Sequence, residues 1–277
     1  MERTIASILP AQAVIDDGDM RLFRALPQEQ RIAVGPFVFI DHYRHRSQRG
    51  IGDRPHPHAG IEVVSYLLQG GVEHRDSMGF RDRLGPGDAQ FIHAGRGMLH
   101  AEQPAGGRHG LQLWLSLPPE QKMDEPAYAS IKAADIPCVE GEGSRLHVVA
   151  GDVNGAHGPM ALSGGAVFAR LQLEAGAQVA LQVDARPELS LYVLQGQIDV
   201  GGIALITGEL GLLSGGTRVR IAAQGSEAVE VALLGGLPVQ GEVLFSGPFV
   251  MDTPERIAQA RRDFAAGRMG RLEGVPF

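Results

Sequence analysis

Short runs in which apolar and polar residues alternate recur along the chain, and glycine-containing turns separate them. Residues 61–68, 179–183 and 189–193 show this pattern clearly. Alternation with a period of two gives a β-strand one apolar face, so these runs are typical of half-buried strands. The chain has 38 glycines among 277 residues, dispersed between the runs, which suits many tight turns. Together these features predict an all-β protein.

One helix is predicted near the C-terminus. Thr253 is a typical N-cap residue, and Pro254 suits the first position of a helix. Helical spacing then gives this segment one apolar face, and a glycine at which the helix can end follows. These residues are Ile257, Ala260, Phe264 and Gly267.

The chain also contains an internal repeat. Residues 66–71 and the turn at 85–88 have counterparts in residues 192–197 and the turn at 207–209. Each copy is consistent with a strand, a turn, a second strand and then a glycine–acid turn into another strand. This pattern indicates two related β-domains.

Each predicted domain must bury both of its sheets, so a double-sheet jelly roll is the simplest architecture. The charged, turn-rich stretch 122–144 is the expected connection between the copies. We therefore place two tandem domains at residues 1–132 and 133–277.

Composition excludes several classes of protein. The net charge is −7, and binding to a phosphate backbone needs a positive surface, so we expect no direct nucleic-acid binding. No run approaches about 18 apolar residues, and residues 1–13 lack a secretory pattern, which predicts no membrane span or signal. Cys138 is the only cysteine, which excludes internal disulfides and multi-cysteine zinc sites. We therefore expect a cytoplasmic protein.

Two residue pairs in the first half of the chain carry the chemistry. His56 and His58 are separated by one residue, and so are His100 and Glu102. Residues two apart on a β-strand point to the same face, so each pair can converge on one ion. If the two strands face each other inside a barrel, three imidazoles and one carboxylate meet, a set that suits Fe, Mn, Ni, Cu or Zn. The alternative is separate histidines at the surface or at the mouth of a barrel.

The same segments resemble known motifs. Residues 56–62 with Gly70 resemble the first cupin motif, and residues 86–88 with 94–100 resemble the second. A narrower similarity is to the signature of the pirin family, and the segments that carry it are 35–37, 41–42, 56–70, 94–102 and 247–251. The middle third of the chain matches pirins only in its layout of two cupin domains.

The resemblance to pirins implies a bicupin whose N-terminal domain holds one metal ion through three histidines and one glutamate. Carried over to this sequence, the ligands are His56, His58, His100 and Glu102, and the ion expected first is Fe(2+). The C-terminal domain has no His-x-His pair, so we expect it to bind no metal. The resemblance also implies a monomer.

Two residues close to the expected ligands depart from simple cupin or pirin patterns. Glu62 occupies the general cupin ligand position, but pirins use the later glutamate, so we expect Glu62 to orient a ligand histidine through a hydrogen bond. Ala59 stands where pirins commonly carry arginine, which is expected to alter the charge at the rim of the site.

Some pirins resemble quercetin 2,3-dioxygenases, which open the flavonol ring of quercetin with dioxygen and release carbon monoxide. This resemblance implies a small aromatic substrate whose 3-hydroxyl oxygen binds the ion, which serves as Lewis acid and template. Glu102 is then the expected catalytic residue, because it can accept the hydroxyl proton. The role requires that the apolar barrel raise the pKa of Glu102.

Two other functions stay open. Animal pirins resemble metal-dependent transcription cofactors, in which the redox state of the ion tunes a surface that docks a protein partner, so the chain could be a regulator without catalysis. Sugar-phosphate isomerisation is a further cupin activity. It needs basic phosphate clamps, and because Lys122 and Lys132 are the only lysines, arginines would have to serve.

Structural roles account for the remaining candidates. His74 is expected in a solvated hairpin turn, with the rim of a pocket as the alternative, and His93 is expected to hydrogen-bond a loop. Residues 42–46, with two histidines and two arginines, are typical of a solvated basic face, and a supporting contact near the metal loop is the alternative. Trp114 is expected to pack in the core or a domain interface rather than against a ligand. Cys138 has no expected role.

Overall fold

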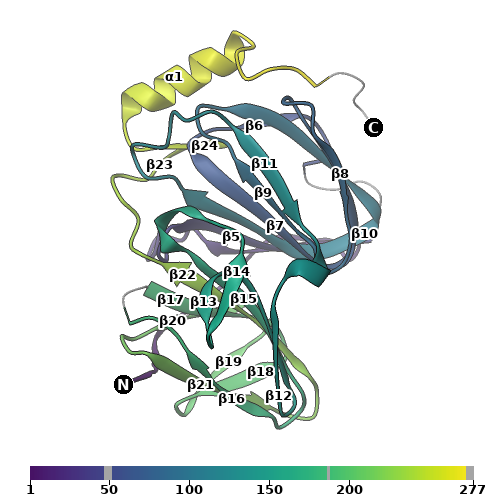
Figure 1. The fold of residues 1–277 in the computed structure, drawn as a ribbon, viewed down its shortest axis with the longest axis vertical. Coiled ribbons are helices and arrows are strands. Elements are labelled where there is room, and N and C mark those ends of the chain that lie inside the picture. Colours follow the sequence, from purple (N-terminus) through teal and green to yellow (C-terminus); the bar gives the residue numbers. More distant parts are fainter. Residues whose placement is uncertain (47–51, 186–187, 273–277) are drawn as a thin grey trace. The chain divides into compact units, whose positions relative to one another are not determined.

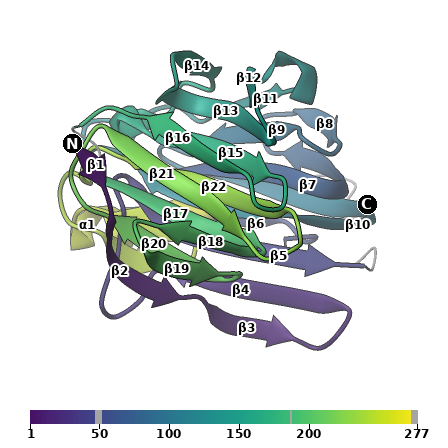
Figure 2. The ribbon, with the colours of Figure 1, turned by 90° about the horizontal axis from the view of Figure 1, so that it is seen from below.

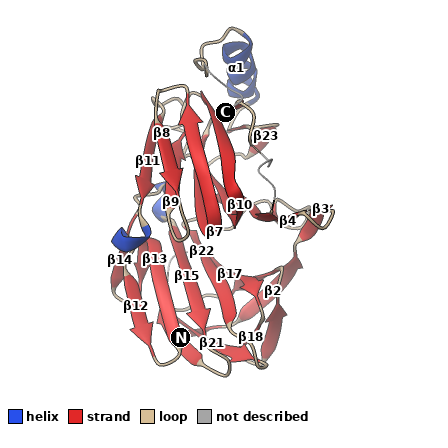
Figure 3. Ribbon diagram, turned by 90° about the vertical axis from the view of Figure 1, so that its right-hand side faces the viewer, coloured by secondary structure: helices blue, strands red, loops and turns tan. Residues whose placement is uncertain are grey.

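Almost all of the regular structure is β-strand (Figure 1 and Figure 3). The computed structural model describes residues 1–46, 52–185 and 188–272. One α-helix lies within these residues, α1 (Pro254–Ala265), together with the short 3-10 helices η1 (Ala133–Asp135) and η2 (Ser163–Gly165). The predicted all-β class, with a helix near the C-terminus, is confirmed.

The chain divides into two compact units, and each unit is built from separate stretches of sequence. Unit 1 comprises Met1–Gln12, Ala25–Phe37 and the described part of Ala134–Val239. Unit 2 comprises Ala13–Arg24 and the described parts of Val38–Ala133 and Gln240–Phe277. The division into two domains at residues 1–132 and 133–277 stays a prediction.

Unit 1 is a sandwich of two β-sheets (Figure 2). Its larger sheet contains β2 (Ile5–Pro10), β12 (Cys138–Gly141), β13 (Ser144–Val153), β14 (Ala156–Pro159), β15 (Val167–Leu173), β17 (Glu188–Gln195), β20 (Glu209–Leu213) and β22 (Val229–Gly236). Its smaller sheet contains β1 (Glu2–Arg3), β16 (Gln178–Gln182), β18 (Gln197–Val200), β19 (Ile203–Ile206) and β21 (Arg218–Gln224).

Apolar side chains from both sheets of unit 1 form one core. Leu171 and Leu233 from the larger sheet pack in the same cluster as Val219 and Ile221 from the smaller sheet, and all four are buried. The alternating runs predicted at 179–183 and 189–193 fall on β16 and β17, with their apolar positions turned into this core. The interior of unit 1 is therefore filled by its own aliphatic residues.

Unit 2 is organised around one curled sheet in the order β11-β9-β7-β10-β5-β4-β3, with β6 added to β10 and β8 added to β7. Its strands are β3 (Gln12–Asp16), β4 (Met20–Leu26), β5 (Phe37–His45), β6 (His56–His58), β7 (Ile61–Asp76), β8 (Arg81–Leu84), β9 (Ala89–His93), β10 (Met98–Ser116) and β11 (Ala127–Ile131). A separate hairpin is formed by β23 (Leu244–Ser246) and β24 (Phe249–Met251).

The two long strands β7 and β10 pair along almost their whole lengths, and this pairing shapes unit 2. Their register shifts between Pro104 and Arg108. At the shift Gly70 has a φ of 78°, and a Cβ at that position would collide with the Gly107 backbone, so only glycine fits there. The shift lets the strands bend, and both halves of β10 consequently line one cavity.

The C-terminal helix forms as its sequence predicts. Thr253 Oγ1 accepts a hydrogen bond from the Arg256 backbone N–H at 3.2 Å, which confirms the predicted N-cap. On the apolar face, Ala260 is buried and the Phe264 ring meets the Phe249 ring edge-to-face, with 6.2 Å between centroids. Among the described residues, no helix has both the length and the apolar character to cross a membrane.

Lys122 is fully buried and ties three segments of unit 2 together. Its Nζ donates hydrogen bonds to the Gly60 carbonyl at 2.9 Å, the Ser116 hydroxyl at 3.0 Å and the Val250 carbonyl at 3.0 Å. These groups belong to the turn after β6, the end of β10 and strand β24. All three protons of the ammonium group are used, so it needs no water. Burial lowers the pKa of Lys122 from 10.5 to about 8.

We expect Lys122→Met to lower the free energy of unfolding by about 2–4 kcal/mol, because it leaves buried acceptors without donors. The pKa of Lys122 is lower in the folded chain, so the unfolded chain binds more protons between pH 8 and pH 10.5. The stability that Lys122 contributes therefore rises with pH across this window. Urea unfolding of both proteins measures the difference, with exposed Lys132→Met as the control. A difference that stays constant from pH 8 to pH 10.5 would contradict the expectation.

Candidate metal centre

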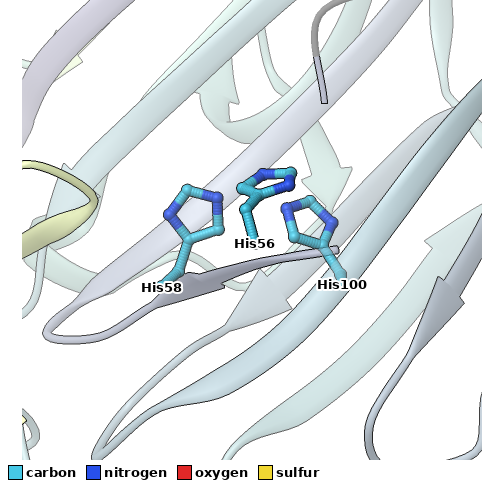
Figure 4. Close-up of side chains that lie close together, drawn as sticks. All are labelled: His56, His58 and His100. Atoms are coloured by element: carbon cyan, nitrogen blue, oxygen red, sulfur yellow. The ribbon is translucent and has the colours of Figure 1, made fainter. Parts of the chain in front are cut away.

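Three histidines converge in unit 2 because two neighbouring strands pair there. In the antiparallel register of β6 and β10, His56 lies opposite His100, and His58 is two residues along the same face. The ring centroids are 4.3 Å apart for His56 and His100, 4.9 Å for His58 and His100, and 5.0 Å for His56 and His58 (Figure 4). One ring nitrogen from each residue lies within 4.8 Å of the other two. From the sequence, the convergence was conditional on two strands that face each other inside a barrel. In the structure the two strands are instead neighbours in one sheet.

The ring nitrogens of these histidines are arranged as a metal ion requires. The Nδ1–H of His56 donates to the Arg54 carbonyl at 2.9 Å, which leaves Nε2 as a potential ligand. His58 and His100 are buried, and the ring nitrogens of His100 have no hydrogen-bond partner among the described residues, while His58 lies beside the Pro248 backbone. Buried polar atoms of this kind normally have partners, so a bound cation fits the site. Burial, followed by the neighbouring histidines, holds the pKa of His58 and of His100 well below 6.5, so both rings are in the neutral form that binds metals.

Glu102 lies at the edge of this group. Its Oε1 is 3.6 Å from His100 Nδ1, and the carboxylate forms a second close group with His100 and His74. It does not belong to the group that all three predicted histidines form. Arg108 Nη1 donates to Oε2 at 2.8 Å, and the Gln90 side-chain amide donates to Oε1.

The electrostatic environment of Glu102 differs from the sequence-based expectation. Burial raises the pKa of Glu102, but Arg108, together with His74 and His56, outweighs burial, and the net effect is a pKa below the ordinary value. The raised pKa that the proposed role as proton acceptor requires is therefore not found. Sequence reasoning missed Arg108 because this residue lies beyond the strand bend, which brings it back beside Glu102.

His74 is a buried neighbour of the site and does not lie in a solvated turn. It is 1% exposed, and its ring stacks on Tyr128 with centroids 4.3 Å apart. Its Nε2 is 3.1 Å from Asp76 Oδ2, and its ring centroid is 5.6 Å from that of His100. The expectation of a turn fails because β7 continues to Asp76, and His74 and Asp76 share one strand face. The period of two in His74-x-Asp76 was the signal that could have placed it.

The run 42–46 is only partly a solvated face. Arg44 and Arg46 are exposed as expected, but His42 and His45 are buried. The Nε2 atoms of His42 and His109 are 2.7 Å apart, and burial lowers the pKa of His42 to about 3. His45 Nε2 accepts a hydrogen bond from Arg108 Nε at 3.0 Å, so this histidine supports the residue that holds Glu102.

Glu62 and Ala59 contact parts of unit 2 other than those expected. Glu62 Oε1 is 3.5 Å from His93 Nδ1, which pairs it with His93 in place of a predicted ligand. Glu62 lies three positions from Ser65, which faces Glu102, so the period of two puts Glu62 on the opposite side of β7. Ala59 is fully buried and pairs with Phe249.

A cavity of about 530 Å³ adjoins the three histidines. Phe39 and Trp114 stack along its wall with centroids 4.1 Å apart, and the Trp114 ring meets the edge of His58 at 5.0 Å. Trp114 was expected to serve only as packing, and the structure corrects this because it lines the cavity. Arg24 lies over Phe39 at 4.3 Å and donates to both oxygens of Asp41, at 2.8 and 2.9 Å. Sequence reasoning missed Arg24 and Phe39, which the β4–β5 pairing brings to this wall.

Unit 1 holds no comparable site among the residues that the structure describes. The groups of histidine and carboxylate with spacing suited to a metal ion all lie in unit 2. Cys138, in unit 1, is exposed.

Comparison with known proteins agrees with this architecture. The sequence matches the pirin family over residues 19–115 and the pirin C-terminal cupin domain over residues 168–270. It is 34% identical to a Vibrio cholerae protein provisionally named a quercetin 2,3-dioxygenase, over 96% of this chain and 97% of that protein.

Two solved structures extend the comparison. The crystal structure of quercetin 2,3-dioxygenase from Acinetobacter baumannii is 28% identical, with a TM-score of 0.88 over 98% of this chain and 99% of that chain. A bacterial pirin from Escherichia coli in complex with nickel(II) is 22% identical, with a TM-score of 0.67 over 84% of this chain and 100% of that chain. These likenesses confirm the predicted tandem cupin fold, and the chain belongs to the pirin family.

Proposed function

We propose that this protein is a metal-dependent dioxygenase of the quercetin 2,3-dioxygenase type, which opens the ring of flavonols with dioxygen. The observation that carries the proposal is the group of His56, His58 and His100 beside an aromatic-walled cavity of about 530 Å³. A cavity of this size suits a small planar molecule. The relatives named as quercetin 2,3-dioxygenases support the same chemistry.

His56, His58 and His100 would hold one divalent ion, with Glu102 as the fourth ligand. Three imidazoles and a carboxylate form a borderline donor set that suits Fe, Mn, Ni, Cu or Zn, and the resemblance to pirins makes Fe(2+) the first candidate. When bound, such an ion supplies Lewis-acid activation of the substrate hydroxyl and, if redox-active, a route for electrons to dioxygen. The nickel complex of the Escherichia coli pirin supports a transition metal in this family.

The cavity walls would orient the substrate. The Phe39 and Trp114 side chains give the cavity an aromatic, apolar wall against which an aromatic ligand would pack. Arg24 and Asp41, at the end of this surface, offer a hydrogen-bond donor and an acceptor for hydroxyl groups. Glu102 as acceptor of the substrate proton stays a prediction, and Arg108 lowers its strength as a base.

A monomeric state and a cytoplasmic location stay predictions. The alternative function, a metal-dependent regulator that docks a protein partner, also stays a prediction. The regulator needs the same metal group but no substrate in the cavity. Oxygen consumption therefore separates the two functions.

We expect His58→Ala and His100→Ala each to reduce the affinity for Fe(2+) or Ni(2+) by at least about tenfold, because each removes a buried ligand nitrogen. Elemental analysis after gel filtration measures the bound metal. His157→Ala is the matched control, since His157 lies on the exposed surface of unit 1. Thermal melting shows whether each variant is folded. Full metal content in both folded variants would remove the proposed centre.

We expect the iron-loaded protein to consume dioxygen and release carbon monoxide with quercetin. Trp114→Ala should raise KM about tenfold with a smaller effect on kcat, because it removes part of the aromatic wall of the cavity, whereas Trp114→Phe should preserve most of the affinity. An oxygen electrode and carbon monoxide detection provide the measurements. About one equivalent of iron without oxygen uptake across flavonols would reject the dioxygenase and favour the regulator.

A further inference from the structure

Glu102 and Arg108 form a buried ion pair beside the candidate metal centre. Glu102 is 2% exposed and Arg108 is 5% exposed, and the Nη1–Oε2 distance is 2.8 Å. The short, charge-assisted bond lies in a region that water does not screen. A carboxylate that is already paired with a guanidinium group donates less charge to a metal than an unpaired carboxylate.

Side chains from neighbouring strands hold both Arg108 and Glu102 in place. Arg108 Nε donates to His45 Nε2 at 3.0 Å, and its guanidinium carbon lies 4.8 Å from the centre of the Tyr43 ring. On the other side, the Gln90 amide donates to Glu102 Oε1. These contacts come from β5 and β9, so the pair is held by strands other than β10, its own strand.

The remaining charged residues that line the cavity also balance. Among the described lining residues, Arg24 is paired with Asp41, and Asp53 is followed by Arg54. With Glu102 and Arg108, three acidic residues face three basic residues. These six side chains therefore contribute no net charge to the cavity.

We propose that Arg108 is a positioning residue that neutralises Glu102, so that the metal centre keeps its full charge for an anionic oxygen ligand such as an ionised phenol or enol. The inference rests on the metal site of the proposed function, and it specifies the ionised form of the substrate. The charges of a divalent ion, Glu102 and Arg108 add up to a net charge of +2. Without Arg108, the ion and Glu102 have a net charge of +1. In a buried site, one unit of charge changes the affinity for an anion strongly and leaves the affinity for a neutral ligand little changed.

The role of Arg108 can be tested by binding azide, an anionic ligand, and imidazole, a neutral ligand, to the cobalt(II)-loaded protein. Ligand binding to cobalt(II) changes its visible spectrum, which provides the measurement. We expect Arg108→Gln to weaken azide binding about tenfold while imidazole binding changes less than about twofold. Arg108→Lys keeps the charge and should retain azide affinity. Glu102→Gln should strengthen azide binding, and the double variant Arg108→Gln, Glu102→Gln should return it to the wild-type value, because the charges again balance.

Azide affinity that is equal in wild type and Arg108→Gln, or azide and imidazole affinities that fall together, would overturn the inference. Metal content and thermal melting verify that each variant is loaded and folded. If Glu102→Gln loses cobalt, the comparison of Arg108→Gln with Arg108→Lys still decides. Failure of the proposed function gives a different result, namely the expected azide series without oxygen uptake on any flavonol.

Discussion

The antiparallel pairing of β6 with β10 is the constraint on which the candidate site depends. His56 lies opposite His100 in this register, and a slip by one residue would turn His100 to the other face of the sheet. Lys122 stabilises this pairing, because its Nζ donates hydrogen bonds to the Gly60 carbonyl, which follows β6, and to the Ser116 hydroxyl, at the end of β10. Lys122 therefore helps to position the three histidines without contacting them.

Curvature of the sheet turns a local pairing into a cavity. Because β7 and β10 bend at a glycine-rich register shift, residues at both ends of β10 line the same space. His100 and Glu102 lie before the bend and Trp114 lies after it, so one strand supplies the polar wall and part of the aromatic wall. Unit 1 has the same kind of fold, but leucine and valine side chains fill its interior. The difference between the two units lies in the side chains that point inward.

Buried charge is the main cost of the arrangement in unit 2, and pairing offsets it. A lone carboxylate at Glu102 would be strongly destabilised, whereas the guanidinium of Arg108 and the amide of Gln90 compensate it. The same pairing makes Glu102 a weaker base than an apolar environment would. The role of Glu102 as a proton acceptor therefore stays a prediction that this pairing does not favour.

Spacing over a few residues was enough to predict the all-β class, the C-terminal helix with its Thr253 cap, and the convergence of His56, His58 and His100. It did not determine where His74, His42 and Arg108 lie, nor that Trp114 lines a cavity. Those positions depend on where strands end, where they bend and which strands become neighbours. For His74, the spacing to Asp76 held a local signal, but using it required knowing that β7 continues to Asp76. Arg108 is only six residues from Glu102, and their contact depends on the register shift between Pro104 and Arg108, which follows from the pairing of β10 with β7.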